Sequence, residues 1–348
     1  MEALPPVRPL DERAMEQTER RLGVLTKPPG SLGFLETLAV WLAGIFRQAP
    51  PPVPRRKAVI LFAADHGVVA QGVSAYPQAV TAQMVTNFLR GGAAINVLAR
   101  QMQARLWIAD VGVATPLPPA AGLWSCRVRS GSRDLTEAPA LTRDEVWRAI
   151  GIGRELVRQA AAEEAQLLAF GEMGIGNTTP ATALVAIWTR AGLERVVGPG
   201  TGLDEQGVAR KRQVVAAALQ RHQPRPDDPI GALEAVGGLE IAAIVGGLVE
   251  AASQALPVVL DGFIVTAAAL VASSLVPQAR AYWIAGHCSG EPGHRIALDH
   301  LGLRPLLDLG MRLGEGTGAV LAFPIVEAAA RLCGEMATFE EAGVSGRL

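Results

Sequence analysis

The chain has 348 residues, of which 49% are hydrophobic and 19% are charged, and its formal net charge is −1. This length predicts two domains or one large domain with an appendage, and the apolar fraction is sufficient for a sizeable core. The charge balance argues against partners such as nucleic acid or an anionic membrane surface. The three cysteines are widely spaced, which indicates neither a disulfide framework nor a zinc site.

The N-terminal segment lacks the apolar core of a signal peptide. The longest apolar run, 262–276, is shorter than the roughly 20 residues that a membrane span needs. We therefore expect a soluble, cytoplasmic protein.

Helices are predicted at both ends of the chain, with strands and helices alternating between them. Two N-terminal helices are expected at 11–25 and 31–46, followed by a proline-rich linker at 50–54. Continuous apolar runs predict buried strands at 57–64, 105–112, 165–170, 257–260 and 281–286. A further short strand is expected at 124–128. Helices are expected between them at 80–89, 93–103, 145–164, 181–192, around Lys211, at 230–255 and 263–274, and an alanine-rich helix ends near 332. The alternation predicts a doubly wound α/β fold with a mostly parallel, Rossmann-like sheet.

Glycine pairs divide the long apolar segment 230–255. We expect its helix to be interrupted at Gly237-Gly238 and loosened at Gly246-Gly247. These glycines are predicted to permit close packing rather than to bind a ligand.

The stretch 171–180, Gly-Glu-Met-Gly-Ile-Gly-Asn-Thr-Thr-Pro, joins a predicted strand to a predicted helix. Thr178 or Thr179 can cap that helix, and Pro180 suits its first turn. Backbone N–H groups at a helix N-terminus bind anions such as phosphate, although a tight turn without a ligand explains the pattern equally well. The stretch lacks the Gly-Lys-Ser/Thr of a Walker A loop and the spacing of a dinucleotide fingerprint.

Polar residues follow several of the predicted strands at their carboxyl ends, among them Asp65-His66, Asp110, Asp261 and His287. Open α/β sheets bind ligands at that edge, so these residues predict one shared cleft. Asp65 and His66 are adjacent on a strand, point to opposite faces, and are therefore expected to act separately.

Glu315 lies between two glycines in the sequence Arg-Leu-Gly-Glu-Gly-Thr-Gly, 312–318. In an apolar pocket its pKa would rise toward the range that suits a general base. The alternatives are a glutamate that faces solvent or one that serves only as a partner in helix capping.

Other candidate groups are weaker. His66, His287 and His294 could hold a metal only if three strand ends converged, which we disfavour. Ser289 lacks the Gly-x-Ser-x-Gly frame of a serine nucleophile, and Asp227-Asp228 is expected to be a solvated linker.

Several motifs taken together resemble the nicotinate-nucleotide:dimethylbenzimidazole phosphoribosyltransferases of cobalamin lower-ligand assembly. They run in order along nearly the whole chain: Lys27-Pro-Pro-Gly-Ser-Leu-Gly33, Ala64-Asp-His-Gly-Val68, Gly72-Val-Ser-Ala-Tyr-Pro77, Val80-Thr-Ala-Gln-Met84, Gly91-Gly-Ala-Ala-Ile-Asn96, 171–180, Gly200-Thr-Gly202 with Lys211, Asp261-Gly-Phe263 and 312–318.

The resemblance implies transfer of 5-phosphoribosyl from nicotinate mononucleotide to 5,6-dimethylbenzimidazole, with Glu315 as the general base and with no cofactor or metal. It implies phosphate and donor binding by Glu172, Gly174, Ile175, Gly176, Asn177, Thr178, Gly200, Thr201, Gly202, Lys211 and Ser289. It implies an acceptor-base pocket formed by Ser74, Tyr76, Gln83, Met84 and Leu313. It also implies a homodimer.

The family resemblance implies a small helical domain built from both chain termini. Residues 1–50 would supply its N-terminal helices, and 304–348 would supply the catalytic loop and the C-terminal helix. Residues 55–303 would form the large α/β domain.

Two other functions remain open at this point. The protein could use another acceptor, such as adenine or a phenol, because pocket size rather than a motif decides that choice. It could instead be a nucleotide-binding protein without catalytic activity.

Overall fold

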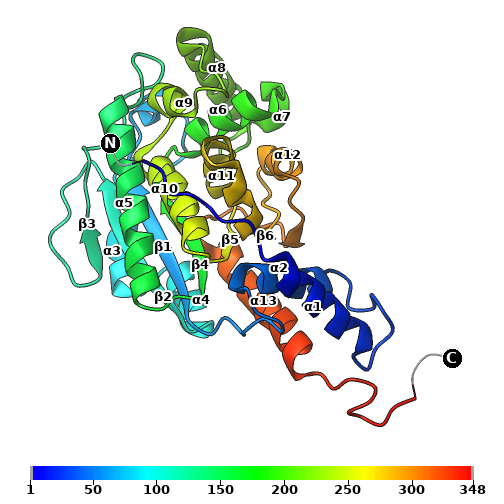
Figure 1. Ribbon diagram of the computed structural model, residues 1–348. Helices are drawn as coiled ribbons and strands as arrows, with labels where there is room; N and C mark the ends of the chain where they lie inside the picture. Colours follow the sequence, from blue (N-terminus) through cyan, green and yellow to red (C-terminus); the bar gives the residue numbers. More distant parts are fainter. Residues whose placement is uncertain (1–2, 346–348) are drawn as a thin grey trace.

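Seven parallel strands form one sheet in the order β3-β2-β1-β4-β5-β6-β7 (Figure 1). The computed structural model describes residues 3–345. The strands are β1 (Lys57–Ala64), β2 (Ala104–Gly112), β3 (Leu123–Ser125), β4 (Leu167–Met173), β5 (Val258–Leu260), β6 (Trp283–His287) and β7 (Pro305–Leu307). The predicted α/β fold with a parallel sheet is confirmed.

The direction in which strands are added reverses beside β1. The chain places β2 and β3 on one side of β1 and then returns to place β4 to β7 on the other. In open α/β sheets such a reversal leaves a crevice outside the carboxyl ends of the two central strands, where ligands bind. The carboxyl ends of β1 and β4 are therefore the expected place for a site.

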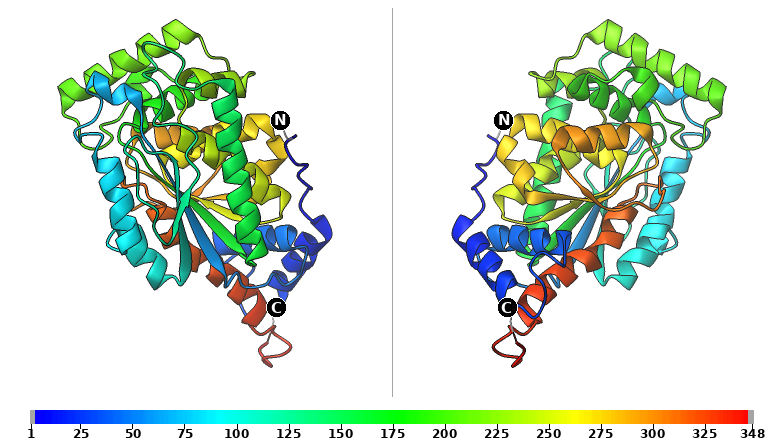
Figure 2. Two further views of the ribbon diagram at one scale, coloured as in Figure 1. Left: turned by 90° about the vertical axis from the view of Figure 1, so that its left-hand side faces the viewer. Right: turned by 90° about the vertical axis from the view of Figure 1, so that its right-hand side faces the viewer.

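Helices cover both faces of the sheet (Figure 2). Ile60 and Phe62 of β1 point into one apolar layer, whereas Val59 and Leu61 point into the other. The first layer is covered by α5 (Arg143–Ala162), α6 (Thr178–Thr189), α7 (Leu193–Val196), α8 (Glu205–His222), α9 (Pro229–Val236), α10 (Leu239–Ser253), α11 (Phe263–Leu275) and α12 (Pro292–Leu301). The second is covered by α1 (Glu12–Val24), α2 (Phe34–Phe46), α3 (Val80–Arg90), α4 (Ala94–Gln101) and α13 (Thr317–Glu335). Two short 3₁₀ helices, η1 (Gly67–Gln71) and η2 (Pro277–Tyr282), complete the elements.

Helix α10 runs without a break through Gly246 and Gly247, so the predicted loosening there is wrong. A Cβ on Gly246 would come within 2.8 Å of the carbonyl carbon of Ile150 on α5, and one on Gly153 of α5 would lie 2.7 Å from that of Ala243 on α10. The glycines therefore let two helix backbones touch. The predicted break at Gly237-Gly238 and the predicted role in packing are both confirmed.

The strand before the glycine-rich stretch is longer than predicted. It continues through Met173, and helix α6 already begins at Thr178, which leaves only residues 174–177 as the turn. The N-cap is Asn177 rather than Thr178 or Thr179, and its side chain makes no capping hydrogen bond. The first N–H groups of α6 thus have no side-chain cap.

Other differences are smaller. Helix α2 begins at Phe34 rather than at Ser31, because residues 30–33 form turns around the carboxylate of Glu36, which accepts from the N–H of Leu32 at 3.1 Å. Helix α12, which follows the loop after β6, was not predicted.

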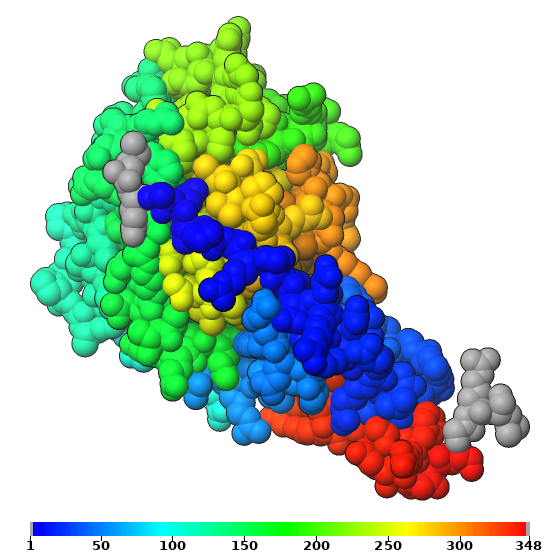
Figure 3. Space-filling view, viewed as in Figure 1, coloured from blue at the N-terminus to red at the C-terminus, as the bar shows by residue number. Residues whose placement is uncertain are grey.

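The N-terminal helices lie beside the C-terminal helix. Helix α2 packs against α1 and against α13, and these three helices gather at one end of the molecule (Figure 3). Helix α13 is long and apolar enough to cross a membrane by length and composition alone, yet it packs against α2, α4 and four strands of the sheet.

Candidate active site

A cavity of about 440 Å³ opens at the carboxyl ends of the strands. Its walls come from the β4–α6 turn, the loop around Gly200, the segments that follow β5 and β6, and the loop that carries Glu315. The size is within the range of small-molecule sites. A cleft is therefore present at the predicted edge of the sheet, but of the polar residues that predicted it only His287 lines the wall; Asp65, His66, Asp110 and Asp261 do not.

Most of the residues predicted for the site line this cavity. They are Tyr76, Met84, Glu172, Gly174, Ile175, Asn177, Thr178, Gly200, Thr201, Ser289, Leu313 and Glu315. Gly176, Gly202, Lys211, Ser74 and Gln83 are not part of the wall. The hydroxyl of Ser74 lies 3.1 Å from that of Thr201, which is in the wall, whereas Gln83 is exposed on α3.

Lys211 lies behind the glycine-rich turns, fully buried. Its ammonium group donates to the hydroxyl of Thr178 at 2.6 Å and to the carbonyl of Gly198 at 3.2 Å. Burial lowers the pKa of Lys211 to about 8, although the charge of Glu291 opposes the shift. The positive charge thus lies behind Thr178, at the start of helix α6.

Glu291 holds the second glycine-rich loop from the other side. Its carboxylate accepts a hydrogen bond of 2.9 Å from the N–H of Gly200, a residue in the left-handed region with φ 54°. Arg312 donates to the carbonyl of Gly200 at 2.7 Å. The loop is therefore fixed by side chains from two other segments.

Glu172 is the last polar residue of β4 and is buried against the turn. The side-chain amide of Asn177 donates to its carboxyl group. Burial, followed by the negative charge of Asp261, raises the pKa of Glu172 to about 8. The group is therefore mostly protonated at neutral pH and can donate a hydrogen bond.

Glu315 is buried in the same cavity, so the alternative of a solvent-facing side chain is wrong. Its carboxylate faces the N-terminus of α4, where the N–H of Ile95 lies 3.4 Å from Oε2. Burial and the charge of Asp261 raise the pKa of Glu315, while the bond from Ile95 opposes them. Such a carboxylate is more basic than an exposed one, as suits a general base.

The loop of Ser289 is fixed by His294. The N–H of Ser289 donates to Nδ1 of His294 at 2.7 Å, so the ring proton is on Nε2, which lies 2.9 Å from the hydroxyl of Thr266. Burial lowers the pKa of His294 to about 3, which keeps the ring neutral. This histidine is a structural support for the cavity wall.

Asp65 and His66 have separate partners, as predicted from the sequence. Asp65 accepts from the N–H of Ala114 at 2.7 Å, and Nε2 of His66 lies 2.8 Å from Glu240. Burial opposes protonation of His66, but the charge of Glu240 outweighs it and raises the pKa. Within residues 3–345, no three His, Cys, Asp or Glu side chains are grouped so as to hold a metal ion.

Several wall residues were not predicted, namely Val80, Phe263, Ile264, Glu291 and Arg312. The apolar ones belong to helices whose patterns indicate only burial, because a core face and a pocket wall have the same composition. Arg312 lies in the motif 312–318, but the sequence pattern assigns no role to its side chain.

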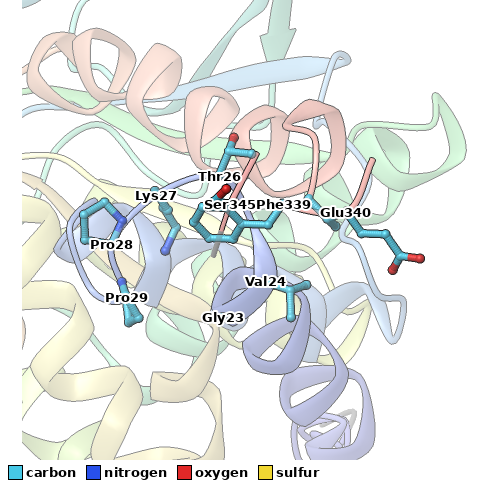
Figure 4. Close-up of a pocket in the computed structure, with 10 residues that line it drawn as sticks. Gly23, Val24, Thr26, Lys27, Pro28, Pro29, Phe339, Glu340 and Ser345 are labelled. Atoms are coloured by element: carbon cyan, nitrogen blue, oxygen red, sulfur yellow. The ribbon is translucent and has the colours of Figure 1, made fainter. Parts of the chain in front are cut away.

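A second cavity of about 940 Å³ lies beyond the C-terminal end of α13, between the segment 23–29 and the segment 338–345 (Figure 4). Val24, Thr26 and Lys27 face Phe339 and Glu340 across it. The ammonium group of Lys27 is bonded to Glu36 at 2.8 Å. The first motif of the resemblance therefore lies apart from the cavity of Glu315 within this chain.

Comparison with known proteins places the whole chain in one family. A family model described as phosphoribosyltransferase matches residues 7–344. A nicotinate-nucleotide–dimethylbenzimidazole phosphoribosyltransferase of Chloroflexus aurantiacus is 54% identical over 340 residues, covering 98% of this chain and 97% of the relative. The protein of that name from Desulforamulus reducens is 52% identical over 344 residues, covering 99% and 98%.

The crystal structure of the Thermus thermophilus enzyme of the same name superposes with a TM-score of 0.92 at 52% identity, covering 97% of this chain and 100% of the other. The fold described above agrees with that likeness. This chain belongs to the nicotinate-nucleotide–dimethylbenzimidazole phosphoribosyltransferase family.

Proposed function

We propose that the protein transfers 5-phosphoribosyl from nicotinate mononucleotide to 5,6-dimethylbenzimidazole. The products are nicotinate and α-ribazole 5′-phosphate, with inversion at the anomeric carbon, and the reaction belongs to cobalamin lower-ligand biosynthesis. One observation carries the proposal: a buried carboxylate of raised pKa, that of Glu315, shares one cavity with glycine-rich turns and an apolar wall.

The donor's 5′-phosphate is assigned to the two glycine-rich turns. Helix α6 begins at Thr178 without a side-chain cap from its N-cap residue, and Lys211 supplies positive charge next to Thr178. Anions bind at such helix N-termini because the free N–H groups and the helix dipole both favour negative charge. Glu172, which is protonated, and Ser289 are assigned to the ribose or the nicotinate.

The acceptor base is assigned to the wall formed by Tyr76, Met84 and Leu313. A flat bicyclic ring is bound best by apolar and aromatic side chains. Tyr76 and Leu313 are 53% and 57% exposed, so this wall lies at the open side of the cavity.

The chemical step requires one proton to leave the acceptor. A ring nitrogen of the benzimidazole attacks the anomeric carbon as the bond to the pyridinium nitrogen breaks, and that bond's electron pair neutralises the departing ring. The benzimidazole then carries a positive charge unless its N–H proton is removed, and the Glu315 carboxylate accepts it. A positioned base contributes about 10²–10⁴-fold to such a reaction.

We also propose a homodimer, and a small helical domain formed by the terminal helices. The exposed apolar side chains at the cavity mouth support the homodimer. The packing of α2 against α1 and α13 supports the small helical domain. Sedimentation velocity measures the oligomeric state, and a monomer at all concentrations would contradict the first of these proposals.

The deciding experiment incubates the purified protein with nicotinate mononucleotide and a panel of acceptors, and identifies the products by mass spectrometry. We expect transfer to 5,6-dimethylbenzimidazole. Transfer only to adenine or a phenol would identify another acceptor, and binding without any transfer would indicate a protein that has lost catalysis.

The role of Glu315 is tested by Glu315→Gln, which keeps the shape but cannot accept the proton. We expect kcat to fall by about 10²–10⁴-fold while nicotinate mononucleotide still binds. Glu335→Gln, at the exposed C-terminal end of helix α13, which follows the Glu315 loop, is the control. Normal turnover by Glu315→Gln would show that another group is the base.

A further inference from the structure

We propose that Asp261 is the positioning residue for Glu315, because its buried carboxylate holds the backbone that follows the glutamate in one conformation. The inference rests on the general-base role proposed above. It concerns a residue that lies outside the cavity wall and acts through another group.

The loop that carries Glu315 has an unusual backbone. Gly314, Glu315 and Gly316 have φ values of 84°, 63° and 87°, so three consecutive residues lie in the left-handed region. For a residue with a side chain this costs on the order of 1–2 kcal/mol. Glu315 therefore needs contacts elsewhere that keep it there.

Those contacts are not supplied by the loop's own sequence. Gly316 is the N-cap of α13 and has no side chain with which to bind the first N–H groups of the helix. Such groups, when buried, need an acceptor from another part of the chain.

Asp261, which follows β5, supplies the acceptor. Its Oδ1 accepts from the N–H of Gly318 at 2.8 Å and of Ala319 at 3.0 Å, and its Oδ2 accepts from the N–H of Gly316 at 3.1 Å. The side chain is 1% exposed. Three N–H groups and the positive end of α13 thus stabilise a carboxylate at this buried position, and the carboxylate in turn fixes the peptide that follows Glu315.

Strand β4 packs against the other side of the loop that carries Glu315 and limits the movement of that loop. A Cβ on Gly171 would lie 2.6 Å from the carbonyl carbon of Glu315, so the strand and the loop touch backbone to backbone. The glutamate is held between Gly171 on one side and the Asp261 bonds on the other. A shift of about 1 Å in such a group can cost about 10²-fold in rate.

If Asp261 served only to cap helix α13, it would make the same contacts. The test must therefore also measure a property that capping alone would not change. Besides burial, the charge of Asp261 raises the pKa of Glu315, and that of Glu172 as well. The other charged or titratable groups in the cavity of Glu315 are Glu172 on β4, His287 on β6, Glu291 before α12 and Arg312 of the same loop. Nε2 of His287 lies 3.6 Å from Oδ1 of Asp261.

The experiment compares Asp261→Asn with Asp110→Asn. Asp110 is also buried at a strand's carboxyl end, but it binds the N–H of Val113 and the side chain of Arg127 rather than the Glu315 loop. For Asp261→Asn we expect kcat to fall about 10- to 100-fold with KM for the donor within about twofold. We also expect the acidic limb of the kcat–pH profile to move to lower pH, because a neutral amide no longer raises the pKa of Glu315. Asp110→Asn should keep the wild-type profile.

The double variant Asp261→Asn/Glu315→Gln separates this inference from the proposed function. If Asp261 acts through Glu315, adding Asp261→Asn to Glu315→Gln lowers the residual kcat less than twofold. A further tenfold loss, or an acidic limb that stays in place in Asp261→Asn, would overturn the inference. If Glu315→Gln alone is fully active, it is the base assignment that fails.

The kcat–pH profile of the wild-type protein also tests the inference, and this measurement does not depend on whether a variant folds. The inference requires an acidic limb above 4.5, the ordinary pKa of a glutamate. A limb at or below that pH would overturn it, even if Asp261→Asn does not fold.

Discussion

The ammonium group of Lys211 lies 2.6 Å from the hydroxyl of Thr178, on the buried side of the turn that begins helix α6. Helix α8 therefore places a positive charge next to the first residue of α6. The two residues are 33 positions apart, and their contact joins the two glycine-rich segments into one site.

Replacement of Lys211 by Met should weaken binding of nicotinate mononucleotide by about 10- to 100-fold, because a hydrogen bond from a charged group contributes ~1.5–3 kcal/mol. Because burial lowers the pKa of Lys211 to about 8, wild-type affinity should also fall as the pH rises through that value. Titration calorimetry from pH 7 to 9 measures both effects. Lys57→Met, which removes a lysine paired with Glu327, is the control, and equal affinities for the two variants would exclude Lys211 from phosphate binding.

Glu172 should make the protein less stable as the pH rises. Its folded pKa of about 8 is above the ordinary value of 4.5, so the stability it contributes is fully present below pH 4.5 and is lost as the pH rises to about 8. The free energy of unfolding should fall within this window by up to about 1.4 kcal/mol per pH unit from this group. Glu172→Gln should lack that component in urea unfolding measured from pH 5 to pH 8.

Glu250→Gln serves as a control, because the pKa of Glu250 shifts in the opposite direction to that of Glu172. Burial raises the pKa of Glu250, but the hydrogen bonds from Arg154 and Arg158 outweigh it and lower the pKa. The Glu250 carboxylate therefore stabilises the fold at pH values above its unfolded pKa. Glu250→Gln should lower the free energy of unfolding at neutral pH. Parallel stability curves for wild type and Glu172→Gln would contradict the raised pKa.

Alanine at Gly171 should disturb the loop of Glu315, because the added Cβ would lie 2.6 Å from that residue's carbonyl carbon. We expect about a 10²-fold loss of kcat and a destabilisation of ~1–3 kcal/mol. Gly23→Ala adds a Cβ with no atom within 4 Å and serves as the control. Unchanged turnover in Gly171→Ala would mean that the loop can move away without cost.

Alanine at Gly246 should separate helices α5 and α10, because its Cβ would lie 2.8 Å from the carbonyl carbon of Ile150. We expect a loss of ~1–3 kcal/mol in the free energy of unfolding. Gly151→Ala, on the exposed face of α5 with open space around it, should instead stabilise by ~0.5–1 kcal/mol, since alanine favours helix. Thermal melts of the two variants should shift in opposite directions.

Local patterns predicted the long strands well and the element boundaries less well. The run 57–64 became β1 without change, because seven buried residues in succession suit a central parallel strand. The 165–170 run extended to Met173 and shortened the turn, since glycine is compatible with strand as well as turn. Gly246 was misjudged because its effect depends on Ile150, which belongs to another helix.

The sequence by itself determined the parallel α/β fold and the edge of the sheet where the site lies, because apolar periodicity and glycine spacing are local properties. Most of the individual site residues were implied by the family resemblance of the motifs. Only the tertiary structure decided how those residues act. The N–H that reaches Glu315 comes from Ile95, 220 positions away, and the carboxylate that holds its loop comes from Asp261. Protonation states and backbone conformation depend on such packed neighbours, which no local pattern specifies.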